Sequence, residues 1–428
     1  MEAGRDALED LVSRSGDRSN LGCRFCGAPL SDVFVDLGAS PLANSYLEPE
    51  DLGKAEPFYP LCVYVCAECF LVQLPEEEKP EAIFSDYAYF SSYSESWLRH
   101  AETYASAVIE RFGLGPGHQV IEIASNDGYL LRWFKERGIP VLGVEPARNV
   151  AAAAEEAGIP TIVKFFGEAT ARDLKAQGKR ADLLVGNNVL AHVPDLNDFV
   201  AGLKTLLAPT GVLTMEFPHL LRLIEEDQFD TIYHEHYSYF SFTTVRKVFA
   251  AHGMTLFDVE ELPTHGGSLR IYARHDEDDS KPVGERVADL LVREETARLN
   301  CLKTYSSFSE RVQRVKRDLL RFLIQAKEEG KSIAGYGAAA KGNTLLNYCG
   351  VRTDFIDYTV DRSPHKQGRY LPGTRIPIHA PDRLRETRPD YVLILPWNLK
   401  EEIMEQMADV RSWGGHFVVA IPEVRILE

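Results

Sequence analysis

The densest group of side chains able to move protons lies at residues 229–239, in the segment FDTIYHEHYSY. Tyr233, Glu235 and His236 stand close together there. A carbon atom beside a ketone becomes a nucleophile when a base removes its proton to give an enolate. Histidine suits the role of base because its ordinary pKa is close to neutrality, and a tyrosine hydroxyl can donate a hydrogen bond to the enolate oxygen. The segment therefore predicts proton abstraction from carbon.

Neighbouring side chains extend this hypothesis and leave alternatives open. Glu235 can orient the histidine or bind a sugar hydroxyl, and we expect His192, just past a predicted strand, to reach the same pocket. The cluster could instead be a metal site, although no histidine follows another at the spacing of zinc metalloproteases. A hydrogen-bonded layer of the core is the third interpretation.

A second constellation, EIASNDG at Glu122–Gly128, runs from a predicted strand into a predicted helix. Its small residues let the backbone approach a ligand, and a helix N-terminus offers free N–H groups. Glu122 suits the positively charged end of a sulfonium cofactor, and Glu145, ending the next strand, can accept both hydroxyls of an adenosine ribose. These features favour S-adenosylmethionine, with another adenosine compound as the alternative. The candidate cofactor-binding residues are Glu122, Ser125, Asn126, Asp127, Gly128, Glu145, Pro146, Asn187 and Asn188.

Four cysteines near the N-terminus form two pairs, Cys23-x-x-Cys26 and Cys66-x-x-Cys69. Each pair lets two thiolates meet one ion, and two pairs complete a tetrahedral Zn²⁺ site. Because four protein ligands leave no open coordination position, we predict a structural zinc that stabilises a small N-terminal module. Four unrelated buried cysteines are the alternative.

Near residue 335, a glycine- and alanine-rich loop, GYGAAAKG, connects a predicted strand to a predicted helix. Loops of this kind cradle phosphates on backbone N–H groups, and Lys341 can neutralise a diphosphate. Asp361 and Arg362 follow the next predicted strand and can touch a ribose or a base. A plain turn with one solvated lysine is the alternative. The candidate substrate-binding residues are Gly337, Ala338, Lys341, Asn343, Asp361 and Arg362.

The elements that must position these groups alternate between strands and helices. Segments such as QVIEIA, VLGVEP and GVLTMEF are typical of buried strands, and NVAAAAEEAG is typical of a helix, so we predict a parallel, doubly wound sheet. A charged helical stretch at about 282–330 is expected to pack on both of its neighbours, and a second, shorter α/β unit follows it. Residues 21–80 indicate a small module of short strands.

Composition limits the classes of function. The 428 residues carry a formal net charge of −17, which argues against a nucleic-acid partner, since nucleic-acid binding needs a positive surface. The first residues are polar and charged, unlike a secretion signal, and no apolar run approaches the roughly 20 residues of a membrane span. We expect a cytoplasmic protein without a membrane partner. The sequence leaves a monomer or a dimer open.

In this order, the motifs resemble those of the nucleotide-sugar C-methyltransferases of deoxysugar biosynthesis. The resemblance extends from about residue 21 to 420 and includes the cysteine pairs, the cofactor loop, the Tyr233–His236 segment and the loop near residue 335. Further motifs that carry it are Leu37-Gly38, Pro41-Leu42-Ala43-Asn44, Asp86-Tyr87 with Tyr89, Asn187–His192 and His265-Gly266-Gly267-Ser268.

This resemblance implies an α/β fold of three parts. Residues 1–80 would hold the tail and the zinc-binding module, and residues 81–275 a central class I Rossmann-like methyltransferase domain that binds S-adenosylmethionine. Residues 276–428 would form a linker helix and a C-terminal Rossmann-like α/β domain that binds the nucleotide sugar.

The resemblance also implies a reaction, methylation at C-3 of a nucleotide-linked 4-keto-6-deoxy sugar, in which the ketone acidifies the C-3 proton. His236 would be the base with Tyr233 and Glu235 beside it, and Tyr87 and His192 would line the sugar pocket. The alternatives are O- or N-methylation of a sugar nucleotide, or a non-catalytic protein that binds sugar nucleotides.

Overall fold

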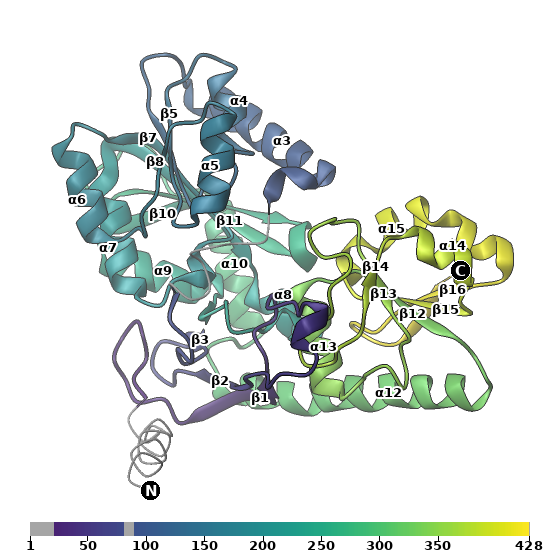
Figure 1. Cartoon of the computed structure of the whole chain (residues 1–428). Helices are drawn as coiled ribbons and strands as arrows, with labels where there is room; N and C mark the ends of the chain where they lie inside the picture. The colour runs from purple at the N-terminus through teal and green to yellow at the C-terminus, as the bar shows by residue number, and fades with distance from the viewer. Residues whose placement is uncertain (1–20, 81–89, 428) are drawn as a thin grey trace, which may run out of the picture.

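The computed structural model of the chain describes residues 21–80 and 90–427, which form three β-sheets surrounded by helices (Figure 1). Tyr87, a predicted pocket residue, lies outside the described residues. The N-terminal sheet has the order β1-β2-β3-β9 and is antiparallel throughout. Its strands are β1 (Asp32–Ser40), β2 (Tyr59–Val65), β3 (Val72–Gln73) and β9 (Ser238–Tyr239).

The central sheet has the order β6-β5-β4-β7-β8-β11-β10. The strands from β6 to β8 run parallel, as the alternation predicts. The next strand, β11, runs antiparallel to both β8 and β10, so the sheet is mixed rather than wholly parallel. The strands are β4 (Val120–Ile123), β5 (Val141–Val144), β6 (Thr161–Ile162), β7 (Ala181–Asn187), β8 (Leu207–Pro218), β10 (Met254–Leu262) and β11 (Ser268–His275).

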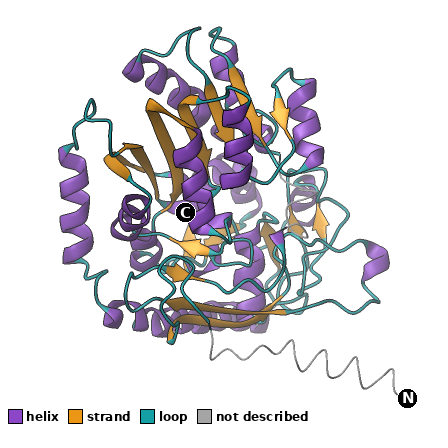
Figure 2. Cartoon of the chain, turned by 90° about the vertical axis from the view of Figure 1, so that its left-hand side faces the viewer, coloured by secondary structure: helices purple, strands orange, loops and turns teal. Residues whose placement is uncertain are grey.

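Helices cover both faces of the central sheet (Figure 2), because successive side chains of a strand point to opposite faces. Val120 packs in the apolar cluster with α3, α4 and α5. Ile121 and Ile123 pack in the opposite cluster, with α6, α7 and α9. The helices of this part are α3 (Glu95–Phe112), α4 (Leu131–Lys135), α5 (Arg148–Glu156), α6 (Glu168–Ala176), α7 (Leu196–Leu206), α8 (Leu220–Glu225), α9 (Phe242–Ala251) and α10 (Glu285–Thr296).

The C-terminal sheet has the order β14-β13-β12-β15-β16-β17 and is parallel except for β17. Its strands are β12 (Ile333–Tyr336), β13 (Thr359–Val360), β14 (Ile378–His379), β15 (Tyr391–Ile394), β16 (His416–Val419) and β17 (Arg425–Leu427). The remaining helices are α11 (Leu302–Ser306), α12 (Phe308–Glu328), α13 (Ala340–Cys349), α14 (Asp382–Thr387) and α15 (Lys400–Gln406). Among the described helices, none combines the length and the apolar character that a membrane crossing requires.

The long helix α12 joins the N-terminal and C-terminal sheets in one apolar core (Figure 1). Its buried residues recur at helical spacing and form a stripe along one side: Phe308, Val312, Val315, Leu319, Leu323 and Ala326. At one end, the ring of Phe308 stacks on Phe34 of β1 with centroids 4.5 Å apart. This part of the predicted helical stretch therefore packs on both neighbours, as its pattern indicates.

Candidate active site

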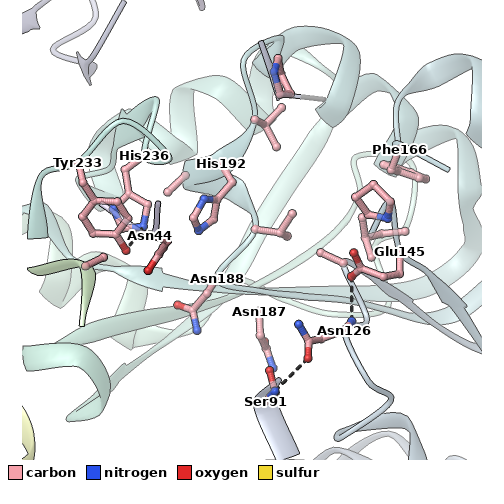
Figure 3. Close-up of a pocket in the computed structure, with 18 of the residues that line it drawn as sticks. Asn44, Ser91, Asn126, Glu145, Phe166, Asn187, Asn188, His192, Tyr233 and His236 are labelled. Carbon is pink, nitrogen blue, oxygen red and sulfur yellow. Dashed lines mark hydrogen bonds between the residues drawn. The ribbon is translucent and has the colours of Figure 1, made fainter. Parts of the chain in front are cut away.

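A cavity of about 520 Å³ lies at the carboxyl ends of the parallel central strands, where open α/β sheets bind their ligands. The loops after β4, β5, β6 and β7 line one part of it. The segment before β9 and the first turn of α13 line the other part, so the central and C-terminal sheets both contribute walls. Figure 3 shows side chains from these loops converging on the open space.

The cavity brings together only some of the predicted site residues. Those that line it are Asn126, Glu145, Pro146, Asn187, Asn188, His192, Tyr233, His236 and Lys341. Those that do not line it are Glu122, Ser125, Asp127, Gly128, Glu235, Gly337, Ala338, Asn343, Asp361 and Arg362. Several members of the second group hold members of the first in place.

Glu122 lies on β4 with its side chain away from the cavity, because Ile123, its neighbour on the strand, points there instead. The Glu122 carboxyl is completely buried. Burial raises its pKa well above 4.5, and the carboxyls of Glu145 and Asp127 raise the pKa further. Glu122 is therefore not part of the cavity wall, and its contact with a sulfonium group stays a prediction.

The loop after β4 is a set of tight turns fixed by its neighbours. Asn126 has a left-handed backbone with a φ of +50°, and its side-chain oxygen accepts a hydrogen bond of 2.9 Å from the N–H of Ser91. The Asp127 carboxylate accepts bonds of 3.0 and 2.6 Å from the N–H and hydroxyl of Ser92. Gly128 has a φ of +76°, and a Cβ there would lie 2.8 Å from Ile159. Asp127 and Gly128 thus shape the loop that presents Asn126.

Glu145, at the end of β5, fits the predicted contact with an adenosine ribose. One Glu145 oxygen accepts a 2.9 Å hydrogen bond from the Asn126 N–H (Figure 3), and the other accepts a 2.8 Å bond from the Ala147 N–H. These two bonds fix the carboxylate at the cavity wall. A carboxylate oxygen can accept a second bond, so both remain able to meet a hydroxyl. The aromatic ring of Phe166 lines the same end of the cavity and packs edge-on against Phe199.

Tyr233 and His236 form a hydrogen-bonded pair in the wall of the cavity (Figure 3). His236 Nδ1 lies 3.1 Å from the carbonyl oxygen of Thr231 and must carry a proton, since a carbonyl only accepts. His236 Nε2, 2.9 Å from the Tyr233 hydroxyl, is then the acceptor of that hydroxyl's proton. Burial lowers the pKa of His236 well below 6.5, so the imidazole is neutral and able to take up a proton.

Two more predicted residues support this pair. The ring of His192 stands 4.7 Å from that of His236, and burial lowers the pKa of His192 to about 4. Glu235 does not reach the cavity, but its carboxylate accepts a 2.6 Å hydrogen bond from the Asn44 amide, which does. Glu235 therefore contacts the cavity wall through Asn44.

Lys341 enters the cavity from the first turn of α13. Its ammonium donates a 2.7 Å hydrogen bond to Asn398 and stands 4.7 Å from the ring centroid of Trp397. Burial lowers the pKa of Lys341. Gly337, at a φ of +97°, turns the loop before α13 past Pro396, so a buried cation faces the cavity at the end of a sharp turn.

The other predicted substrate-binding residues make different contacts. Asp361 accepts a 2.7 Å hydrogen bond from the Ala338 N–H and so holds the loop before α13. Asn343 is buried and donates to the Ala43 carbonyl. Arg362 is exposed and forms an ion pair with Glu402 at 3.4 Å.

Sequence reasoning assigned no role to several residues that line the cavity. They are Asn44, Tyr46, Trp97, Lys164, His265 and Lys366, among others. Asn44 and His265 belong to motifs that carry the resemblance, so these motifs could have identified them as candidate site residues. The other four lie far apart in the chain and in no motif, so only the fold brings them together.

The four predicted zinc ligands lie together, their sulfur atoms all within 4.8 Å of one another. Two of the distances, Cys23 to Cys69 and Cys26 to Cys66, are 3.5 Å. Tetrahedral zinc with Zn–S bonds near 2.3 Å places sulfurs about 3.8 Å apart, so the set fits a closed zinc site. The Gln73 amide donates to Cys23 Sγ at 3.1 Å, a contact of the kind that orients a metal ligand.

Comparison with known proteins divides the chain into three parts. A family model described as "Putative zinc binding domain" matches residues 23–84. One described as "Methyltransferase domain" matches residues 97–259, and one described as "C-methyltransferase C-terminal domain" matches residues 263–422. The cysteine cluster lies in the first, the loops after β4 to β7 in the second, and Lys341 in the third.

Individual proteins resemble the chain over very different lengths. C-methyltransferase NovU of Streptomyces niveus is 36% identical over 405 residues, which cover 95% of this chain and 96% of that protein. A ubiquinone biosynthesis O-methyltransferase of Rhodopseudomonas palustris is 28% identical over 100 residues, covering 23% of this chain and 39% of that protein. The structure of magnesium protoporphyrin IX methyltransferase from Synechocystis has a TM-score of 0.32 and 14% identity, covering 41% of this chain and 78% of that one. The match to NovU over nearly the whole length, with the three family models, shows that the chain belongs to the C-methyltransferase family and is an S-adenosylmethionine-dependent enzyme.

Proposed function

We propose that the enzyme methylates C-3 of a nucleotide-linked 4-keto-6-deoxy sugar through an enolate. The observation that carries the proposal is the Tyr233–His236 pair, which lines one cavity together with Glu145 and with Lys341. His236 can serve as the base, Glu145 can bind the adenosine of the cofactor, and the Lys341 ammonium can bind a phosphate. This combination suits a substrate that loses a proton from carbon and also carries phosphate. The resemblance to nucleotide-sugar C-methyltransferases supports the same substrate class.

We assign removal of the C-3 proton to this pair. Because His236 Nδ1 already bonds to the Thr231 carbonyl, the proton ends on Nε2. It arrives directly, or through the Tyr233 hydroxyl, which gives its own proton to Nε2 while it takes one from C-3. The electrons of the C–H bond form the C-3 to C-4 double bond, and the negative charge moves to the C-4 oxygen. S-adenosylmethionine, when bound, supplies the electrophilic methyl group that C-3 attacks.

The surrounding residues orient the two ligands. On the cofactor side, Asn126, Glu145, Asn187 and Asn188 line the cavity and are proposed to bind S-adenosylmethionine. On the sugar side, Asn44, held by Glu235, offers an amide to a hydroxyl, and His192 closes the wall next to His236. On the resemblance alone, Tyr87 is also proposed to contact the sugar.

The C-terminal part is proposed to hold the nucleotide. Lys341 faces the cavity directly, whereas Gly337, Ala338 and Asp361 shape the loop from which it extends. Asn343 anchors α13 to the N-terminal part through its hydrogen bond to the Ala43 carbonyl. Arg362 lies at the surface and is proposed to contact the end of the nucleotide that is farthest from the sugar.

Exchange of the C-3 proton tests the base. The enzyme, incubated with a nucleotide 4-keto-6-deoxy sugar in heavy water, should introduce deuterium at C-3, and His236→Ala should lose this exchange by at least about a hundredfold. His416→Ala, at an exposed position on β16, is the matched control and should exchange at the wild-type rate. Unchanged exchange in His236→Ala refutes the assignment of the base.

The product separates the proposal from its alternatives. With S-adenosylmethionine present, NMR should show the new methyl group on C-3, and mass spectrometry should show the loss of one hydrogen for each methyl gained. A methyl group on oxygen or nitrogen would reject the enolate route. Tight binding of the nucleotide sugar without any turnover would reject catalysis on this substrate class.

A further inference from the structure

Arg24 stands between two of the cysteines of the zinc cluster, Cys23 and Cys26, and the proton transfer proposed above gives it no role. Its backbone is held on both sides. The Arg24 N–H donates a 2.9 Å hydrogen bond to the side-chain oxygen of Gln73, and its carbonyl accepts a 3.2 Å bond from the Asn197 amide. The long side chain therefore starts from a fixed point beside the metal site.

The Arg24 guanidinium joins three segments that are far apart in the chain. Nη1 donates a 2.5 Å hydrogen bond to the Pro194 carbonyl, and Nη2 donates a 2.6 Å bond to the Leu74 carbonyl. The same group lies 5.4 Å from the centroid of the Tyr237 ring. The Leu74 N–H in turn donates to the Tyr237 carbonyl at 3.0 Å. A planar guanidinium suits such contacts, because it holds several N–H donors in fixed directions and stacks on aromatic rings.

Two of these contacts lie next to histidines of the cavity. Pro194, itself a cavity residue, comes two positions after His192, and Tyr237 directly follows His236. The Tyr237 N–H donates a 2.7 Å hydrogen bond to the carbonyl of the residue before His192. Arg24 thus holds together the two segments whose histidine rings stand 4.7 Å apart (Figure 3).

We infer that Arg24 is a positioning residue for proton transfer, because it holds the loop that carries His192 against the segment that carries His236. The inference rests on the proposed function, in which His236 takes up the C-3 proton. Arg24 does not line the cavity, so it acts through the Pro194 carbonyl and the Tyr237 ring. A small displacement of a base slows proton transfer steeply, whereas the affinity for a ligand that makes many contacts changes little.

The rate of deuterium exchange at C-3 in heavy water measures the position of the base. Arg24→Ala removes the guanidinium and leaves all four cysteines in place, so the zinc content should equal that of the wild-type enzyme. Exchange should fall about tenfold or more, while KM for the nucleotide keto-sugar and the affinity for S-adenosylmethionine change less than about threefold.

Chemical rescue distinguishes positioning from a general loss of structure. Millimolar methylguanidinium should restore part of the exchange in Arg24→Ala. Methylammonium at the same concentration should not, because it lacks the planar set of donors. Arg321→Ala, at an exposed position on α12, is the matched control and should exchange at the wild-type rate with or without either salt.

A second variant and a second measurement need neither a missing side chain nor a substrate. Arg24→Lys keeps the charge and most of the stem but offers one ammonium in place of a planar fork, so it should fold and still lose exchange severalfold. NMR of histidine-labelled enzyme reports the ring positions directly. The ring signals of His192 and His236 should shift in Arg24→Lys and stay unchanged in Arg321→Ala.

The outcomes separate this inference from the proposed function. Exchange at the wild-type rate, or unshifted ring signals, in Arg24→Lys overturns the inference and leaves C-3 methylation standing. Loss of exchange that comes with loss of zinc in both Arg24 variants also overturns it, because Arg24 would then only stabilise the metal site. Shifted ring signals together with no exchange by the wild-type enzyme on any nucleotide keto-sugar overturn the proposed reaction and keep the role of Arg24 in placing the histidines.

Discussion

Burial gives three histidines of the cavity the same protonation state. His192, His236 and His265 come from three different segments, and desolvation is the first cause that lowers the pKa of each. The pKa falls to about 4 for His192 and for His265. An exposed histidine would be half protonated near pH 6.5 and would lose its capacity as a base just below neutrality.

The pH dependence of the reaction should reflect this burial. A lowered pKa leaves the imidazole neutral at every pH above it, so the base form of His236 is present throughout the neutral range. We expect kcat/KM for the keto-sugar to stay level as the pH falls from about 8 to about 6, with no decline centred on the ordinary histidine pKa. Initial rates in buffers of constant ionic strength measure this, and an acidic limb with its midpoint near pH 6.5 would contradict it.

At this scale the sequence predicts the proton-transfer group well, because Tyr233, Glu235 and His236 are neighbours in the chain. It does not show which of them face the cavity: Glu235 does not line it and instead accepts a hydrogen bond from Asn44, a cavity residue from a distant segment. Trp97 and Lys366 reach the cavity only because strands and helices fold together, and no local pattern marks them.

The segment that carries Tyr233 and His236 lies between two sheets. Directly after His236, the Tyr237 N–H donates to the Ala191 carbonyl at 2.7 Å, and β9 then pairs with β3 of the N-terminal sheet. The side chain of Gln73 on β3 bonds to the zinc ligand Cys23. The zinc-binding module is thus linked through β3 and β9 to the position of His236.

Loss of a zinc ligand should therefore weaken both stability and catalysis. Cys66→Ser should lower the bound zinc below one ion per chain and lower the melting temperature by roughly 10 °C, since a structural zinc site contributes strongly to folding. It should also reduce kcat with little change in the affinity for S-adenosylmethionine. Cys301→Ser, outside the cluster, is the control and should leave metal content and melting temperature unchanged. If Cys66→Ser binds no zinc and still melts at the wild-type temperature, the module needs no metal for its stability.

The elements themselves follow the sequence where hydrophobic patterns are long. The predicted strands around Ile121, Leu142 and Leu213 are confirmed as β4, β5 and β8. The reversal of β11 is not predicted, because strand pattern alone carries no direction. The pairing of β9 is not predicted either, since a two-residue strand has no periodicity to detect.

At the scale of the whole molecule, one indole joins the central and C-terminal parts. Trp397, three residues after the end of β15, donates from Nε1 to the buried carboxylate of Asp230 at 2.8 Å. Asp230 belongs to the same segment, residues 229–239, as Tyr233 and His236. Burial raises the pKa of Asp230 to about 6, and the Lys341 charge partly opposes this rise. Among the described residues, Trp397 is the side-chain hydrogen-bond donor to this carboxylate, and the other Asp230 oxygen is buried without a hydrogen-bond partner.

Trp397→Phe should separate shape from hydrogen bonding at this contact. The phenyl ring keeps most of the packing but leaves Asp230 without its donor, which should reduce the free energy of unfolding by about 1–3 kcal/mol. Trp413→Phe is the matched control, because Trp413 donates to the Pro389 carbonyl within the C-terminal part and is half-buried. Denaturant unfolding measures both, and an equal loss in the two variants would mean that Asp230 does not depend on the indole. In an Asp230→Asn background, Trp397→Phe should cause a smaller loss in the free energy of unfolding, because the carboxylate that depends on the indole is no longer there.

The path of β9 has a consequence for how the protein is made. The ribosome releases the chain from its N-terminus, so β1, β2 and β3 emerge long before Ser238 and Tyr239. Until then the edge of β3 has no strand beside it, although the cysteines that precede it have already been synthesised. The N-terminal sheet is therefore completed only after most of the central sheet has left the ribosome. Because β3 and β9 come from different parts of the chain, a chimera in which residues 21–80 are replaced by those of a relative would pair the relative's β3 with the original β9.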